Sequence, residues 1–164
     1  MEGTPFPAVL RRALEERGMK PYRLALNSRV DAVTICKILK YAKYRRNANE
    51  AQVLQLFLGA TCDEVRRERV LDLVEQCEAD FFRETGRLAD AAGMTIQDLA
   101  VRASVGEERV EQARSRTRPA TDAIRLRLAV TVLCTPDEIT IANVFLQAAG
   151  FYTMGGGATR RRSA

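Results

Sequence analysis

The sequence contains one segment twice. Residues 18–30 and 93–105 agree in spacing and residue type, and they lie 75 positions apart. The identical pairs are Gly18 and Gly93, Met19 and Met94, Leu24 and Leu99, Ala25 and Ala100, and Val30 and Val105. A repeat of this kind indicates one structural unit present in two copies. We therefore expect two tandem helical units of about 60 to 70 residues each.

Apolar residues recur at helical spacing through both copies, whereas strand-like alternation is absent. The helices expected in the first copy lie around Val9–Leu14, from Pro21, from a cap at Asp31 to about Lys40, over Val53–Leu58, and from Asp63 to Val74. Those expected in the second copy lie over 83–92, 96–102, 107–115, 121–133 and 136–149. The expected fold class is all-α, with domains at 1–76 and 77–152, a helical connector, and a flexible basic tail at 153–164.

The residue inventory excludes most catalytic chemistry. The chain of 164 residues has no His, so His-dependent acid–base chemistry, Ser–His–Asp triads and most metal sites are ruled out within it. It also has no phosphate-cradling glycine loop, no G-x-S-x-G elbow and no C-x-x-C pair. We therefore expect no enzyme, no catalytic residue, no metal and no cofactor. The four cysteines (Cys36, Cys62, Cys77 and Cys134) are expected to be buried, reduced thiols.

The sequence also bears on location. It has no apolar run long enough to span a membrane, and the first residues lack a signal-peptide pattern. The expected location is the cytoplasm, with no membrane partner.

The repeated segment has the residues that a helix-turn-helix needs. A small residue lets the two helices cross closely, and an apolar residue after the turn seats the second helix. A cap begins that second helix, and two small or branched apolar residues bury its inner face. In chain order these are Ala25, Val30, Asp31, Ile35 and Ile38 in the first copy, and Ala100, Val105, Gly106, Val110 and Ala113 in the second.

With Leu24-Ala25, Val30-Asp31, Ile35 and Ile38, the sequence resembles the lambda-repressor-like, or Xre-type, helix-turn-helix family. The turn position where that family often has Gly holds Arg29 and Ser104, and Leu39 and Tyr41 stand where it commonly has Glu and Gly. The resemblance covers about residues 6–74 and, in a degenerate form, 80–149. It implies two tandem five-helix bundles and a regulator of phage, plasmid or bacterial type. It also implies that the helix opening at Asp31 lies in the major groove. The base contacts it implies are Ala32, Val33, Thr34 and Lys37.

Charge separates the two copies. Residues 20–46 carry eight Lys and Arg against one Asp, a balance of +7, whereas residues 95–121 carry five Arg against four acids, a balance of +1. Phosphate neutralisation supplies much of the affinity for DNA, so the first copy is the expected reader. The backbone contacts expected there are Lys20, Arg23, Lys40, Tyr41, Lys43, Tyr44, Arg45 and Arg46. A second DNA contact remains open at Arg109, Gln112, Arg116 and Arg118. Glu107 and Glu108 oppose it by repelling phosphate.

The expected function is a sequence-specific regulator of double-stranded DNA, most simply a repressor that occupies its operator as a homodimer and is nucleoid-associated when bound. An alternative is an antitoxin-like or polymerase-binding module whose second domain holds a protein partner. Residues 77–150 have a net charge of −2 and residues 1–76 one of +4, which leaves that alternative open. Leu146, Phe151 and Tyr152 are candidates for a dimer seam, which the sequence does not decide.

Overall fold

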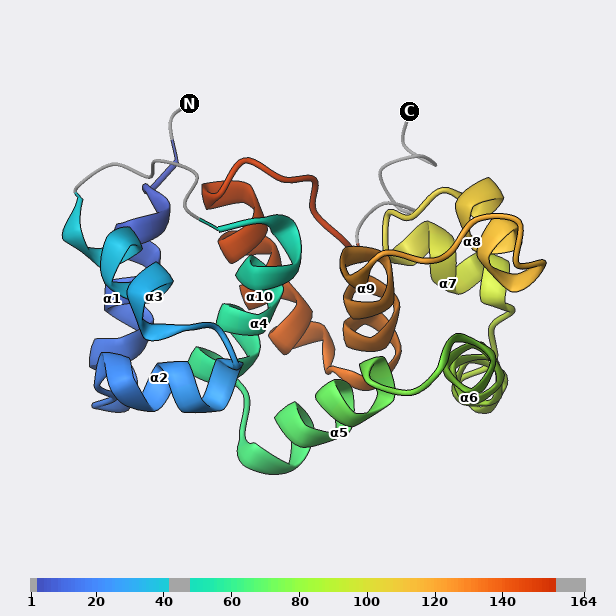
Figure 1. The fold of residues 1–164 in the computed structure, drawn as a ribbon, viewed down its shortest axis with the longest axis horizontal. Coiled ribbons are helices and arrows are strands. Elements are labelled where there is room, and N and C mark those ends of the chain that lie inside the picture. Colours follow the sequence, from blue (N-terminus) through green and yellow to red (C-terminus); the bar gives the residue numbers. More distant parts are fainter. Residues whose placement is uncertain (1–2, 42–47, 156–164) are drawn as a thin grey trace. The chain divides into compact units, whose positions relative to one another are not determined.

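The computed structural model describes residues 3–41 and 48–155, and all the regular structure in this part of the chain is helical (Figure 1). The all-α expectation is confirmed. The helices are α1 (Phe6–Arg17), α2 (Pro21–Ser28), α3 (Ala32–Lys40), α4 (Glu50–Thr61), α5 (Glu64–Val74), α6 (Glu78–Ala91), α7 (Ile96–Arg102), α8 (Glu107–Arg114), α9 (Asp122–Leu133) and α10 (Pro136–Ala148).

Local capping explains where several of these helices begin and end. The Asp31 carboxylate accepts a hydrogen bond from the Thr34 amide at 2.7 Å and so opens α3. A capping box opens α4: Asn49 accepts from the Gln52 amide at 2.8 Å, and Gln52 accepts from the Asn49 amide at 2.9 Å. Gly18, with a φ of 59°, ends α1 in the left-handed conformation. For α3, α7, α8 and α10, the expected first and last residues lie within one residue of those observed.

The chain divides into two compact units. The first contains the described residues up to Asp63 together with Thr140–Tyr152, and the second contains Glu64–Ile139 together with the described residues from Thr153 onward. The boundary in the packing lies after residue 63, not after residue 76. The domains 1–76 and 77–152 are inferred from the sequence repeat. They stay a prediction, because the compact units of the structure are divided at a different residue.

This division arises because the fifth helix of each sequence copy packs mostly in the unit of the other copy. Phe145 of α10 contacts Phe6 and Phe57 edge to face, with ring centroids 5.9 and 6.0 Å apart. In the second unit α5 packs against α9. There Arg66 of α5 forms a salt bridge with Glu138 at 3.1 Å and donates to the Leu133 carbonyl.

The first unit is closed by large buried side chains from each of its helices. Leu10, Leu24, Ile35 and Leu54 are fully buried, as are the three phenylalanines of the edge-to-face cluster, or nearly so. α2 packs closely against α4. Gly59 is the reason this approach is possible, because a Cβ at that position would lie 2.8 Å from the Ser28 Cβ.

The second unit is closed by Phe81, Leu99 and the apolar face of α9. The beginning of the expected flexible tail is part of this unit. Met154 is fully buried, the Ser104 hydroxyl donates to the Thr153 carbonyl at 2.6 Å, and the Gly155 amide donates to the Arg102 carbonyl. The expectation of a flexible segment starting at residue 153 is therefore wrong for 153–155, and the rest of the tail lies outside the described residues.

The cysteines also differ from expectation. Cys62 and Cys134 are buried, as expected, but Cys36 and Cys77 are exposed. Cys36 occupies the outer face of α3, and Cys77 is the residue before α6, where no core surrounds it. An apolar neighbourhood in the sequence does not specify which face of a short helix is buried.

Candidate nucleic-acid interface

The turn between α2 and α3 is held by Ser28. Its hydroxyl donates to the Leu24 carbonyl at 2.6 Å and accepts from the Val30 amide at 3.2 Å. The Gln55 side chain of α4 donates to the Ser28 carbonyl at 3.3 Å. Arg29 then reverses the chain with a φ of 61°, in the left-handed region that Gly normally occupies. This turn fixes the position from which α3 starts.

The inner face of α3 is seated in the core of the first unit. Val30, Ile35 and Ile38 have at most 3% of their surface exposed. They lie at the positions where the sequence predicts the seating residues of a helix-turn-helix. Their burial fixes which side of α3 is turned outward.

The outer face of α3 is open. It contains five exposed residues at helical spacing: Ala32, Val33, Cys36, Lys37 and Lys40. Val33 is 63% exposed, so a branched apolar side chain is open to solvent on this face. Thr34 is half-buried at the border of this face. Three of the four residues expected to contact bases are thus exposed together, and Cys36, which the sequence analysis assigned to the core, lies among them.

The C-terminal end of α3 is tied to α1. The Arg11 guanidinium donates to the carbonyls of Leu39 and Tyr41, the second at 3.0 Å. The Lys40 ammonium lies 5.7 Å from the centre of the Tyr41 ring. Arg11 was not singled out from the sequence, and its role depends on a pairing between segments that are far apart along the chain. It satisfies carbonyl groups that a helix end leaves without an intrahelical donor.

The two remaining described cations of the expected backbone-contacting set lie at the start of α2. Lys20 is the N-cap residue of α2 and Arg23 lies in its first turn, and both are exposed. The other expected residues, Lys43, Tyr44, Arg45 and Arg46, lie outside the described part of the chain.

Asp31 is the one acid in the described part of this stretch. The hydrogen bond from the Thr34 amide holds the pKa of its carboxyl below the ordinary value. Its negative charge stabilises the first turn of α3, where the backbone amide groups attract an anion.

The corresponding helices of the second unit have the same turn but a different outer face. Ser104 has a φ of 57°, close to that of Arg29, and Val105, Val110 and Ala113 are buried. The Arg127 side chain donates to the Ala103 carbonyl at 3.2 Å, as Gln55 does to Ser28. The exposed acids on the outer face of α8 are Glu107, Glu108 and Glu111. They lie 75 positions after Ala32, Val33 and Cys36.

The four residues named as a possible second DNA contact do not form one cationic face. Arg109 is half-buried and donates to the Gln112 side chain at 3.3 Å and to the Pro119 carbonyl at 3.1 Å. Gln112 in turn donates to Glu108 at 3.4 Å. Arg116 and Arg118 are exposed beyond the end of α8, and Arg116 has a φ of 63°.

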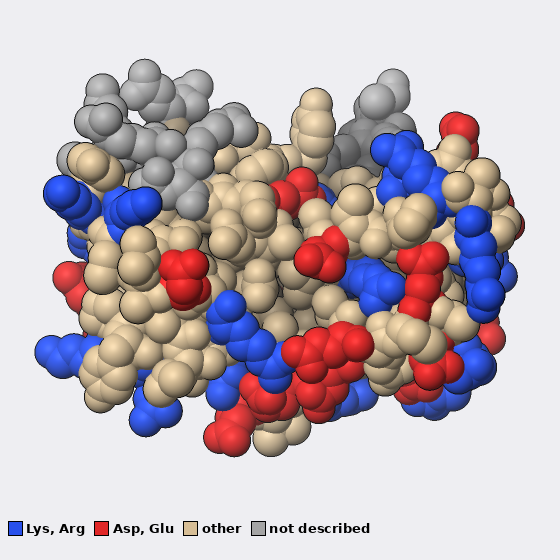
Figure 2. Space-filling model, viewed as in Figure 1, with Lys and Arg blue, Asp and Glu red and all other residues tan. Residues whose placement is uncertain are grey.

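The surface charge reflects this difference. Among the charged side chains in Figure 2, blue ones are more frequent than red ones over α1 to α3, whereas blue and red ones are mixed over α6 to α8. A polyanion would meet an attractive surface beside α3 and a mixed one beside α8.

Other kinds of site find little support in the described residues. No Cys, Asp and Glu side chains within 3–41 and 48–155 form a group of three that could hold a metal ion. None of the helices described has the length and apolar character needed to cross a bilayer. The sequence matches no protein-family model, no curated protein and no solved structure.

Proposed function

We propose that this chain is a sequence-specific regulator of double-stranded DNA, which acts as a repressor by occupying an operator with α3 in the major groove. The observation that carries the proposal is the outer face of α3. This face is exposed, and it combines Lys37 and Lys40 with Ala32 and Val33. The turn before it is fixed by hydrogen bonds that the Val30 amide and the Gln55 side chain donate to Ser28. Occupancy needs no chemistry, which agrees with a sequence that lacks catalytic motifs.

The roles of the side chains follow from their chemistry. The Lys37 ammonium can donate to the guanine acceptors in the major groove, and the methyl groups of Ala32 and Val33 can contact a thymine methyl. Lys20, Arg23 and Lys40 can neutralise phosphates, which positions the protein without reading sequence. The site is therefore expected to have both a base-reading part and a positioning part.

The test is selection of bound sites from random duplex DNA, followed by affinity measurements over a range of salt concentrations. Lys37→Ala should relax the preference at one base position by about 1–3 kcal/mol. Lys40→Ala should weaken all sequences alike and reduce the slope of log K against log salt by about 0.9.

Gln112→Ala makes the equivalent change in the second copy, because Gln112 stands 75 positions after Lys37. It should leave the selected motif unchanged. Selection that yields no motif, or binding insensitive to salt, would refute the proposal.

A second candidate function is an interaction module in which the second unit holds a protein partner, as in an antitoxin or a polymerase-binding factor. The acidic outer face of α8 favours it, because Glu107, Glu108 and Glu111 repel a phosphate backbone but suit a basic protein surface. Glu108→Ala distinguishes the two. If the second unit reads DNA, this substitution changes the selected motif. If it holds a protein, the substitution leaves the motif unchanged and weakens co-purification of a stoichiometric partner.

A further inference from the structure

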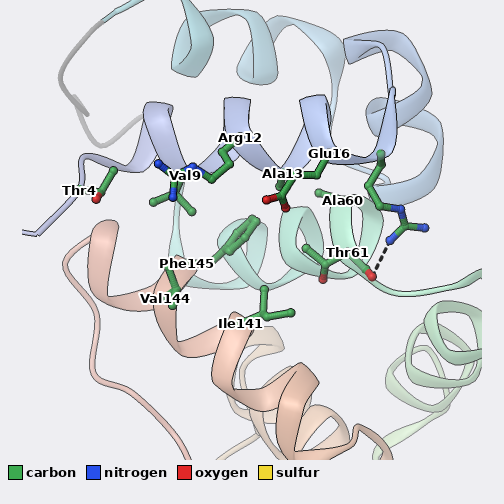
Figure 3. Close-up of a pocket in the computed structure, with 11 residues that line it drawn as sticks. Thr4, Val9, Arg12, Ala13, Glu16, Ala60, Thr61, Ile141, Val144 and Phe145 are labelled. Atoms are coloured by element: carbon green, nitrogen blue, oxygen red, sulfur yellow. Dashed lines mark hydrogen bonds between the residues drawn. The ribbon is translucent and has the colours of Figure 1, made fainter.

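The first unit has an apolar groove on a side of α1 that the α3 face does not use. Its volume is about 330 Å³. Figure 3 shows the groove between α1, the end of α4 and α10. Val9 and Ala13 line it from α1, Ala60 from α4, and Ile141 and Val144 from α10.

Apolar side chains at the groove remain open to solvent. Ile141 is 41% exposed and Val144 is 48% exposed, and they lie three positions apart on α10, so they share one face of that helix. Because they border a hollow lined by other apolar side chains, they belong to one apolar surface patch and are not isolated exposed residues.

The charged residues beside this patch have opposite signs, so two copies of the patch can pair their charges with each other. Arg12 and Glu16 both line the groove, four positions apart on α1. Within residues 3–41 and 48–155 neither makes an ion pair or a side-chain hydrogen bond, whereas the neighbouring Arg17 donates to the Thr61 carbonyl. Two α1 helices that pack antiparallel about a two-fold axis place Arg12 of each beside Glu16 of the other.

We infer that the face around this groove is the homodimer interface, and that its occupant is the same face of a second copy, whose exposed Ile141 and Val144 enter the groove. A two-fold contact brings the same patch of each protomer together, so it requires a surface that is complementary to itself in shape and charge. The groove meets the charge requirement with one cation and one anion on the same helix face. Leu146, a candidate seam residue from the sequence, is fully buried within the first unit and is not available for such a contact. The inference does not depend on DNA binding.

The experiment is sedimentation of the full chain over a range of concentrations, without DNA. The chain should dimerise, and Val144→Glu should raise the dissociation constant by roughly 30-fold or more, because it places an unpaired charge in the apolar part of the contact. Val65→Glu is the matched control. Val65 is 73% exposed on α5, so the same substitution there should leave the dissociation constant unchanged.

A charge exchange tests the orientation. Arg12→Glu and Glu16→Arg should each weaken the dimer about tenfold, since each puts like charges together at two symmetric places. The double variant should restore the wild-type value, because the pairs form again with reversed sign. Circular dichroism of each variant establishes that the monomer is folded.

Two results would overturn the inference: a chain that stays monomeric at all concentrations, or a dimer that Val144→Glu leaves intact. If such a dimer is lost with Tyr152→Glu, the contact lies at the 86% exposed Tyr152 instead of the groove.

Discussion

Replacing Gly59 by alanine tests how α4 positions the turn that presents α3. A Cβ at this position would lie 2.8 Å from the Ser28 Cβ and 2.9 Å from the Ser28 backbone nitrogen. Neither atom can rotate away, so α2 and α4 must separate by about 0.7 Å or more to reach ordinary contact. Overpacking of this kind costs about 1–3 kcal/mol, and the better helix propensity of alanine returns up to about 1 kcal/mol. We expect a net loss of roughly 1–2 kcal/mol in the free energy of unfolding.

Gly86→Ala is the control for this substitution. Gly86 also lies inside a helix, α6, but a Cβ there meets nothing within 4 Å. The same chemical change should therefore stabilise the protein by about 0.5–1 kcal/mol, because only the propensity gain remains. The two substitutions are expected to act in opposite directions.

Urea unfolding followed by far-ultraviolet circular dichroism is the suitable assay, since the chain has no Trp to report by fluorescence. Heating provides a second measure, with a shift of about 2–4 °C per kcal/mol for a chain of this size. If Gly59→Ala is neutral, or stabilises as much as Gly86→Ala, then α4 does not press on the Ser28 turn and the account of how α3 is positioned is wrong.

Three further outcomes are expected. Arg29→Gly should stabilise the fold by about 0.5 kcal/mol, because it relieves the left-handed φ of 61°, whereas Arg23→Gly, inside α2, should destabilise it by about 1 kcal/mol; urea unfolding measures both, and equal signs would contradict the reasoning. The folded pKa of Asp31 lies below its ordinary value of 3.8, so the stabilisation it gives is complete above that pH and disappears as pH falls through the folded pKa. Asp31→Asn keeps a capping oxygen but removes this titration, so its stability should depend less on acid in unfolding curves measured between neutral and low pH. Cys36 should be protected from maleimide by duplex carrying the selected site, with Cys77, exposed in the second unit, still reactive; equal labelling of Cys36 in the presence and absence of DNA would place α3 away from the groove.

The positions of the helices could be predicted from the sequence because their signals are local. Asp31 is followed by Thr34, whose amide it accepts, and Gly18 stands where α1 must end. Likewise, the spacing of Ile35 and Ile38 identifies the inner face of α3, and both are buried. Each of these signals lies within one or two helical turns of the feature that it specifies.

The partners of the helices could not be predicted in the same way. The apolar residues of α10 show that one face is buried, but nothing near them indicates that Phe145 packs against Phe6 and Phe57. The close approach of Gly59 to Ser28 and the hydrogen bonds from Arg11 to the end of α3 also join segments that are far apart along the chain. Burial depends on which segment arrives from elsewhere in the chain, and periodicity contains no information about that segment.

The two copies share the character of their buried residues but not that of their exposed residues, so the two units need not contact the same kind of molecule. The buried positions after the turn keep their apolar character between copies: Val30 corresponds to Val105, and Ile35 corresponds to Val110. Packing constrains these positions, because a polar side chain there would be buried without a partner.

Packing does not constrain the exposed positions, and their residue types differ between the two copies. The outer face of α3 has two lysines, and that of α8 has three glutamates. Two lysines on α3 favour a polyanion, whereas the glutamates of α8, with Arg109 and Arg114 among them, give a surface of mixed charge. The second unit has therefore kept the geometry of the turn but not the positive charge of the outer face of α3. Under the second candidate function, the partner of the α8 face is neutral or basic, and substitutions there should alter association with that partner without altering the selected DNA motif.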